Sequence, residues 1–420
     1  MKWVTALFLF VLFMINYADK SIAGFSAVHI MEEFNLTAGQ WGIVGSSFFW
    51  LFSIAGIIGA GLSDKIGTKK MLAILAICWT VVQVGAFVIY SLPMLIFARI
   101  LLGIGEGPTW ATMVSHLSKW FPERRKGMIF SLVNFGAFIG AVVLTPILVN
   151  LIELQGWRVA WAFLGVLSFI WLILWIFLGK ERPVIPEEPM LTSKEYIPKA
   201  NRKQIVKVLF SASFIFSFFI YFAQMWGTAF STVWLPVYLV KVTHLPMIKM
   251  GVTIGITGII AGIMTIFIST FADYLYKKTN LIRKSYVPIG GISVILGGIF
   301  FYIISITSNL TLILIALTLG QGFAFSVGTI SSVIASGLLP ERRGLIVGTM
   351  SGLVTVAGIL SPIVTGNIVE AAGSNVALGF NHAMIINAII FIITGILFLL
   401  FVKRDEKGLP SNSIPHQIVK

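Results

Sequence analysis

The chain has 420 residues, of which 57% are hydrophobic and only 11% are charged, and its mean hydropathy is +0.96. Water-soluble globular domains of this length do not have such a composition, so we expect a protein embedded in a lipid bilayer. A formal net charge of +14 would favour a nucleic-acid partner in a soluble protein. Here membrane topology explains it, and we expect no nucleic acid among the partners.

Apolar segments of roughly 20 or more residues follow one another along the chain, each long enough to cross a hydrocarbon core of about 30 Å. We count twelve of them, at residues 3–29, 38–62, 70–90, 93–119, 125–150, 158–179, 207–240, 247–276, 285–306, 309–338, 343–371 and 378–402. The sequence therefore predicts an all-α membrane protein with twelve transmembrane helices.

Two observations divide the predicted helices into two halves of six. Residues 179–207 carry four prolines and many charged side chains, which is typical of a linker rather than of a packed core. The sequence Pro-Glu-Arg-Arg at 122–125 returns at 340–343, as in two homologous halves with a substrate site between them. We predict an N-terminal half at 1–180, a linker at 181–206, a C-terminal half at 207–403 and a tail at 404–420.

Basic residues are distributed unevenly between the two sides of the predicted membrane. The N-terminus, the loop that begins at Lys65, the linker and the tail fall on one side, whereas the other side receives only Arg158, Lys241 and Lys249. Because Lys and Arg accumulate in cytoplasmic loops, we place both termini and the linker in the cytoplasm. We expect a multi-pass monomer in the inner (plasma) membrane.

The fourth apolar segment contains two charges, Arg99 and Glu106. A charge at the centre of a membrane helix costs at least about 2.5 kcal/mol, so these residues predict a function. Their spacing corresponds to two helical turns and places them on one wall at different depths. Gly103, Gly105 and Gly107 would let a neighbouring backbone approach or leave room for a ligand. An ion pair that joins two helices is the structural alternative.

Asp19 and Lys20 in the first segment bring the charges well inside the apolar segments to four, two of each sign and all in the N-terminal half. The rise of the helices puts them in one layer near the midplane. Neutral polar side chains that share helix faces extend the candidate substrate site. They are Asn16 and Tyr17 beside Lys20, and Tyr221, Gln224 and Thr228 in the seventh segment.

Residues 60–70 read Ala-Gly-Leu-Ser-Asp-Lys-Ile-Gly-Thr-Lys-Lys and resemble the loop signature of the major facilitator superfamily, with Ala60 in place of the first glycine. In that family the aspartate helps to lock one conformation. The resemblance implies a gating role, which we extend to the repeated loop. The expected gating residues are Asp64, Lys65, Gly67, Arg124 and Asp273.

Three shorter sequences are similar to the anion:cation symporter branch of that superfamily, which includes hexuronate, galactonate and glucarate permeases. They are Asn-Tyr-Ala-Asp-Lys at 16–20, Lys-Trp-Phe-Pro at 119–122 and Trp-Leu-Pro-Val-Tyr-Leu at 234–239. The Arg99-x-x-x-Gly-x-Gly sequence also resembles a fourth-helix motif of the superfamily that is associated with proton coupling.

The resemblance implies roles for individual residues. Asp19 and Glu106 match the proton-coupling carboxylates, with Arg99 beside them, and Lys20 stands where an arginine usually contacts the substrate carboxylate. Phe52 stands where sugar-acid permeases often have a tyrosine, so one hydroxyl is missing. We therefore expect a ligand with fewer hydroxyl groups than a hexonate.

These observations predict a secondary transporter that imports a small organic anion together with protons. An exchanger or uniporter of related anions is the alternative. A membrane enzyme would need clustered nucleophiles, bases or metal ligands, and a sensor would need an output domain, neither of which the sequence contains. We expect no enzymatic activity, no cofactor and no metal, and the expected partners are the anion, protons and the bilayer.

Overall fold

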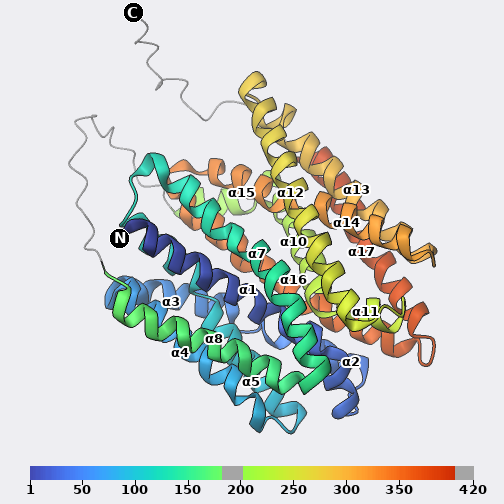
Figure 1. Ribbon diagram of the computed structural model, residues 1–420. Coiled ribbons are helices and arrows are strands. Elements are labelled where there is room, and N and C mark those ends of the chain that lie inside the picture. Colours follow the sequence, from blue (N-terminus) through green and yellow to red (C-terminus); the bar gives the residue numbers. More distant parts are fainter. Residues whose placement is uncertain (182–201, 403–420) are drawn as a thin grey trace, which may run out of the picture.

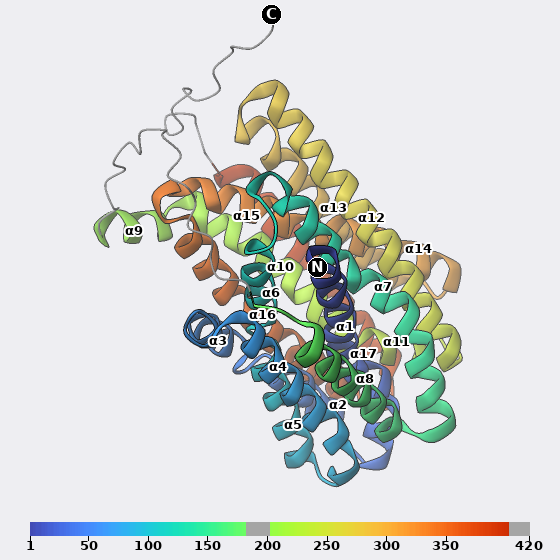
Figure 2. The same cartoon turned by 60° about the vertical axis from the view of Figure 1, so that its left-hand side comes forward.

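The computed structural model describes residues 1–181 and 202–402, and within these ranges the side chains of residues 123, 124, 127, 138, 141, 142 and 340 are not described. Figures 1 and 2 show two helical bundles side by side, the N-terminal half in blue to green and the C-terminal half in yellow-green to red. All regular structure in the described ranges is helical.

The N-terminal half contains helices α1 to α8. Their bounds are α1 Lys2–Glu33, α2 Ala38–Ser47, α3 Phe52–Ile66, α4 Thr68–Val84, α5 Leu92–Glu106, α6 Thr109–Ser118, α7 Glu123–Gln155 and α8 Trp157–Leu178. In this half α1 packs against α7 and α8, and α4 packs against α8.

The C-terminal half contains helices α9 to α17. Their bounds are α9 Arg202–Leu209, α10 Ala212–Val233, α11 Leu235–Lys241, α12 Met247–Thr279, α13 Tyr286–Ile306, α14 Leu310–Phe325, α15 Val327–Leu338, α16 Arg343–Ala371 and α17 Val376–Phe401. Here α13 packs against α14 and α17, and α10 packs against α16.

Eleven helical segments of the described ranges are long and apolar enough to cross a membrane. The remaining predicted span corresponds to α7, which has 33 residues and contains two shorter apolar stretches, Met128–Ala137 and Val143–Gln155. The predicted all-α architecture is thus confirmed. A membrane span can be assembled from two helices, since α2 with α3, α5 with α6 and α14 with α15 each cover one predicted segment.

Breaks within the predicted segments have local causes. The fourth segment divides at Gly107 and Pro108, between α5 and α6, because proline lacks an N–H and clashes with the preceding turn. The seventh segment was predicted to begin at residue 207, but α10 begins later, where the Ser211 hydroxyl accepts the N–H of Phe214. The short helix α9 precedes it and begins inside the predicted linker.

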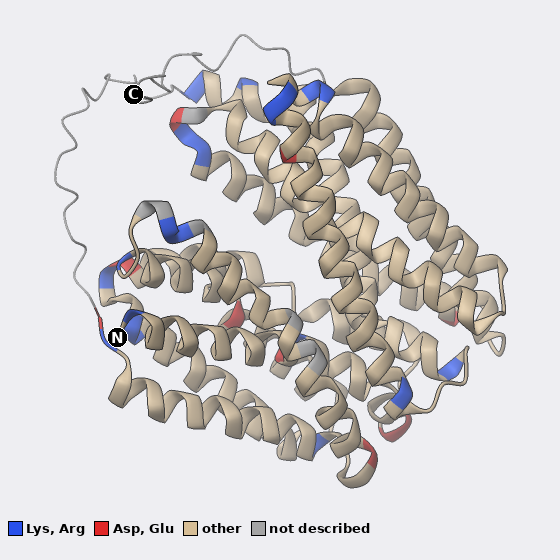
Figure 3. Cartoon of the chain, turned by 45° about the horizontal axis from the view of Figure 1, so that its top comes forward, with Lys and Arg blue, Asp and Glu red and all other residues tan. Residues whose placement is uncertain are grey.

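Figure 3 shows that Lys and Arg residues gather at the end of the molecule that holds the N-terminus, which we call the basic end. The opposite, far end holds the C-terminal end of α1 and the start of α2. There the halves are joined directly. The N–H of Gly39 donates a hydrogen bond of 2.7 Å to Oε2 of Glu370, and Lys241 pairs with Glu32 at 2.5 Å.

Glycines allow α2 and α16 to meet almost backbone to backbone at this end. A Cβ on Gly42 would lie 2.5 Å from the carbonyl oxygen of Pro362, and one on Gly366 would lie 2.5 Å from that of Ala38. Real side chains do not approach so closely, so either substitution would force the two helices apart. The seam between α2 and α16 therefore depends on glycine.

Gly42→Ala is expected to open the far end, although alanine is normally better than glycine in a helix by about 1 kcal/mol. Overpacking costs about 1–3 kcal/mol, which would shift the balance between closed and open forms fivefold or more. Spin labels at the exposed Leu154 and Leu378, in a background without Cys78, would report longer distances. Gly258→Ala is the control, because a Cβ at Gly258 meets nothing within 4 Å. Unchanged distances in the Gly42 variant would contradict the prediction.

A candidate anion and proton site in the N-terminal half

The four charged side chains predicted from the sequence lie together between α1 and α5. Lys20 Nζ is 3.5 Å from Glu106 Oε2, and the side chain of Lys20 is 28% exposed whereas that of Glu106 is 0% exposed. Asp19 and Arg99 are also fully buried. The cluster has no net formal charge, and Lys20 is its most accessible member.

Arg99 is held by an aromatic ring rather than by a carboxylate. Its guanidinium carbon lies 4.8 Å from the ring centroid of Phe48, a distance typical of a cation–π contact. The backbone carbonyl of Phe48 occupies the space that a side chain on Gly103 would need, and that of Phe52 does the same at Gly107. Gly103 and Gly107 therefore allow close helix packing, and backbone atoms occupy the space beside both glycines.

Lys20 faces the residues that the sequence placed beside the substrate. Its Nζ lies 5.6 Å from the ring centroid of Phe52 at the start of α3. Tyr17 is 39% exposed, but Asn16 is buried at 1%. The structure therefore brings Lys20, Glu106 and Phe52 together. Asn16 is buried too deeply to be freely accessible to a substrate.

Asp19 has a partner that the sequence analysis did not identify. Nε2 of Gln83, on α4, donates a hydrogen bond of 2.8 Å to Asp19 Oδ1, and both residues are 0% exposed. Gln83 is a strongly polar residue in an otherwise apolar segment, which is the signal that could have singled it out.

The cluster is short of hydrogen bonds within the described residues. Asp19 Oδ2 and both Nε and Nη1 of Arg99 are buried without a hydrogen-bond partner there. Since more than 90% of buried polar groups in proteins are paired, this concentration of unpaired atoms indicates a place where protons or a polar ligand bind.

The polar residues predicted for the second half make their described contacts within that half. The Tyr221 hydroxyl lies near Ser351 of α16, and Gln224 packs against Gly328 of α15. The hydroxyl of Thr228 donates to its own helix. A role for these three in substrate binding stays a prediction.

A hydroxyl pair that the sequence analysis missed joins the halves next to Phe52. Oγ of Ser53 lies 2.5 Å from Oγ1 of Thr355 on α16. Isolated Ser and Thr residues are common in membrane helices, so the sequence alone gave no reason to select this pair.

The predicted gating residues occupy separate positions. Asp64 and Lys65 are exposed at the end of α3, and Gly67, with φ +93°, makes the turn into α4, a conformation that favours glycine. Asp273 accepts a hydrogen bond of 2.6 Å from the Tyr286 hydroxyl. The side chain of Arg124 lies outside the described residues. Gating by these residues stays a prediction.

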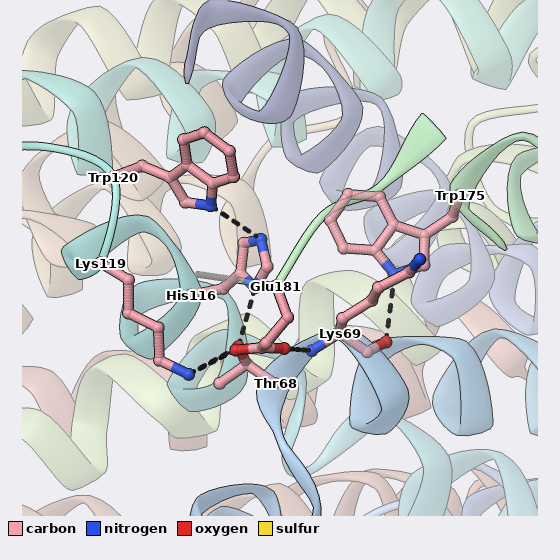
Figure 4. A network of polar contacts seen from close by, with 7 residues as sticks. All are labelled: Thr68, Lys69, His116, Lys119, Trp120, Trp175 and Glu181. Atoms are coloured by element: carbon pink, nitrogen blue, oxygen red, sulfur yellow. Dashed lines mark hydrogen bonds and ion pairs between the residues drawn. The ribbon is translucent and has the colours of Figure 1, made fainter. Parts of the chain in front are cut away.

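A polar network next to Gly67 ties Glu181, which follows the C-terminal end of α8, to the basic end (Figure 4). Glu181 accepts hydrogen bonds from Lys119 Nζ at 2.6 Å, the backbone N–H of Lys69 at 2.5 Å and the Thr68 hydroxyl at 2.9 Å. Its carboxylate therefore caps the N-terminus of α4, where an anion is favoured.

His116 continues this network into the N-terminal half. Its Nδ1 lies 2.8 Å from Thr68 Oγ1, and its Nε2 accepts a hydrogen bond from Trp120. Because Thr68 gives its hydroxyl proton to Glu181, His116 must donate through Nδ1, which assigns the neutral tautomer with the proton on that atom.

Glu181→Gln is expected to destabilise the half by about 1 kcal/mol at neutral pH, since the carboxylate is partly exposed. Partial burial raises the pKa of Glu181, but hydrogen bonds from Lys119, Lys69 and Thr68 lower it by more, so the pKa lies below its ordinary value. The stabilisation is therefore present above the ordinary pKa and is lost as the pH falls through the lowered one.

Thermal unfolding of the wild type and the Glu181→Gln variant in detergent, from pH 7 down to about 3, would measure this difference. The gap between the two proteins should be constant near neutrality and should close in acid. A gap that is independent of pH would contradict the assigned role of the carboxylate charge.

Within residues 1–181 and 202–402, no group of three or more His, Cys, Asp or Glu side chains is placed to hold a metal ion. The charged cluster itself consists of two carboxylates, an ammonium and a guanidinium in a buried setting. Such groups can bind an anion and exchange protons.

Several known proteins are similar to this chain over most of its length. The family model described as Major Facilitator Superfamily matches residues 9–362 and 283–417. A hexuronate transporter of Bacillus subtilis is 28% identical over 392 residues, which cover 89% of each chain. A probable sulfoacetate transporter of Cupriavidus necator is 26% identical, covering 86% of each chain. A probable galactarate/D-glucarate transporter of Escherichia coli is 24% identical, covering 90% of this chain and 91% of the relative.

Solved structures share the fold at low sequence identity. A bacterial homologue of the human lysosomal transporter Spinster superimposes with a TM-score of 0.80 at 15% identity, covering 96% of this chain and 97% of the homologue. A D-xylose-proton symporter gives a TM-score of 0.76 at 16% identity, with 96% and 98% of the chains covered.

Proposed function

Because this chain belongs to the Major Facilitator Superfamily, we propose that it is a proton-coupled symporter that imports a small organic anion by alternating access. The chain is a multi-pass membrane transporter and not an enzyme. The resemblance to the anion:cation symporter branch is confirmed by relatives named for hexuronate, galactarate/D-glucarate and D-galactonate transport. Coupling, direction and substrate belong to the proposal.

The ion pair between Lys20 and Glu106 is the observation that carries the proposal. Lys20 is the partly exposed cation of the cluster, and its partner is a fully buried carboxylate on another helix. A substrate carboxylate that reaches Lys20 competes with Glu106 for the same ammonium group. Substrate binding and the state of Glu106 are thereby linked.

A proton is the natural replacement for Lys20 at Glu106. An ionised carboxylate that loses its ion-pair partner in a buried site costs about 3–5 kcal/mol, and protonation removes that cost. One anion that binds with one proton also leaves the net charge of the cluster unchanged. When the anion leaves, Lys20 can return to Glu106 and the proton can be released.

The chemistry of Lys20 also influences which class of anion the site would prefer. An ammonium group acts as a point charge and, unlike arginine, does not grip a carboxylate through two parallel hydrogen bonds. Phe52 beside it offers a ring without a hydroxyl. The relatives include a probable sulfoacetate transporter as well as sugar-acid transporters. We therefore favour a monocarboxylate or small dicarboxylate with fewer hydroxyl groups than a hexonate.

The orientation follows from charge. The basic end carries most of the Lys and Arg residues (Figure 3) and would face the cytoplasm. Import then requires the far end to open outward, which means that the seam between α2 and α16 separates in each cycle. The N-terminal half at 1–180 and the C-terminal half at 207–403 would be the two bodies that move.

Uptake by proteoliposomes that contain the purified protein tests the proposal. With acid outside and neutral buffer inside, one of a panel of labelled carboxylates and sulfonates should accumulate above its outside concentration, and a protonophore should abolish this. Uptake that needs a loaded internal anion would indicate an exchanger, and downhill uptake alone a uniporter. Displacement of the substrate by a neutral sugar or an organic cation, but not by carboxylates, would contradict the anion assignment.

A further inference from the structure

Asp19 is turned into the core of the N-terminal half rather than toward the accessible part of the cluster. It is 0% exposed, and its described hydrogen bond is the one of 2.8 Å from Nε2 of Gln83. Gln83 lies in the last turn of α4, is itself fully buried, and has Gly165 of α8 packed against its Cβ. A neutral amide in a closed setting is therefore the group that holds this carboxyl.

Each member of the pair keeps one oxygen without a hydrogen bond. Asp19 Oδ2 and Gln83 Oε1 are both buried and have no partner among the described residues. An ionised carboxylate only accepts, whereas a carboxylic acid donates through its O–H, and an amide carries both a donor and an acceptor. A half-turn of the Gln83 amide exchanges the two, so the pair can be hydrogen-bonded whether Asp19 is ionised or protonated.

We propose that Gln83 is a positioning residue that holds Asp19 and keeps a hydrogen bond to it in both protonation states. This inference rests on the proposed function, in which Asp19 is one of the proton-coupling carboxylates. An apolar residue at this position would leave both states of the carboxyl unpartnered. A lysine or arginine, which has no acceptor, would favour only the ionised state.

The charged groups around Asp19 are few and come from α1 and α5. Lys20 follows it on α1, and Arg99 and Glu106 face it from α5. The other helices that pack around this core, α4, α7 and α8, carry their charged residues only near their ends. The amide of Gln83 is thus the polar group of α4 that reaches Asp19 at the level of the cluster.

Gln83→Met, which keeps the length of the side chain and removes both hydrogen-bonding functions, tests the inference. Proton-driven accumulation of substrate should fall at least tenfold, while exchange of internal for external substrate at fixed pH should stay within about threefold of the wild type. Retained exchange also shows that the variant folds. Thr80→Val is the matched control on the same helix, because the Thr80 hydroxyl bonds only its own helix in the described structure.

The Asp19→Asn background shows whether Gln83 acts through Asp19. In that background Gln83→Met should reduce exchange by less than twofold further. Wild-type accumulation by Gln83→Met, or a full and independent loss in the double variant, would overturn the inference. If the wild type itself fails to accumulate substrate in a pH gradient, the proposed function fails instead, and infrared spectroscopy of Asp19 still examines the pair.

Infrared difference spectra between acid and neutral pH supply a readout that does not need transport. The C=O stretch of protonated Asp19, identified by its absence in Asp19→Asn, should move to higher frequency in Gln83→Met, because the acid O–H has lost its acceptor. An unchanged band position would show that Gln83 only fills space and would overturn the inference.

Discussion

Glu106→Gln is expected to abolish proton-driven accumulation of substrate and to leave substrate exchange across the membrane intact. Glutamine has the shape of the protonated acid and cannot release a proton, so Lys20 stays available to the substrate throughout the cycle. With a pH difference of about 2 units, one coupled proton can support up to roughly 100-fold accumulation. The variant should bring the inside and outside concentrations to equality and no further.

Two comparisons make this result specific to Glu106. Glu153→Gln removes an exposed carboxylate near the end of α7 and should accumulate substrate like the wild type. Exchange of labelled for unlabelled substrate by the Glu106 variant, at a rate within a few-fold of the wild type, would show an intact binding site. Accumulation by the Glu106 variant under a pH difference alone would exclude Glu106 as the coupling group.

Much of the fold was predictable because the bilayer restricts what a chain can do. Apolar segments of sufficient length must become helices, so the spans and their all-α character followed from composition. The breaks within spans were less predictable, since they depend on local features such as Pro108 and on packing. The predicted start at residue 207 fell inside α9, which ends at Leu209, only shortly before α10 begins at Ala212.

The charged cluster was predictable for the same energetic reason, since four charges in apolar segments are conspicuous. Which of the four charges pair with one another was not predictable. Spacing along one helix placed Arg99 and Glu106 at different depths of one wall but identified no partner for either, whereas the structure pairs Glu106 with Lys20 and places Arg99 over the ring of Phe48. Contacts between helices depend on rotations about helix axes, which a single sequence does not reveal.

Neutral residues with a structural role are even harder to identify from the sequence alone. The hydroxyl pair of Ser53 and Thr355 becomes meaningful only when the two partners are known. Gly42 and Gly366 likewise resemble any other glycines of the membrane helices until the seam between α2 and α16 brings each against a facing backbone. A sequence points to residues whose burial in a membrane costs much free energy, such as charges. It does not point to residues whose burial costs little.

Lys20→Met is expected to weaken substrate binding by roughly 10- to 150-fold. A hydrogen bond to a charged group contributes about 1.5–3 kcal/mol, and 1.4 kcal/mol corresponds to a factor of ten in affinity. Methionine keeps an unbranched apolar stem against Phe52, so the loss reports the ammonium group rather than packing. Lys20→Arg should retain binding and could tighten it, because a guanidinium offers two parallel hydrogen bonds to a carboxylate.

The loss of Lys20 also leaves Glu106 buried without its cation, which is itself destabilising by about 3–5 kcal/mol if the carboxylate stays ionised. The double variant Lys20→Met with Glu106→Gln removes that charge and should recover thermal stability without recovering binding. Ligand-dependent shifts in the melting temperature of purified protein, measured with the carboxylate that proteoliposomes accumulate, would separate the two effects. Binding of that carboxylate to the double variant at wild-type affinity would show that Lys20 is a structural partner of Glu106 and not the anion contact.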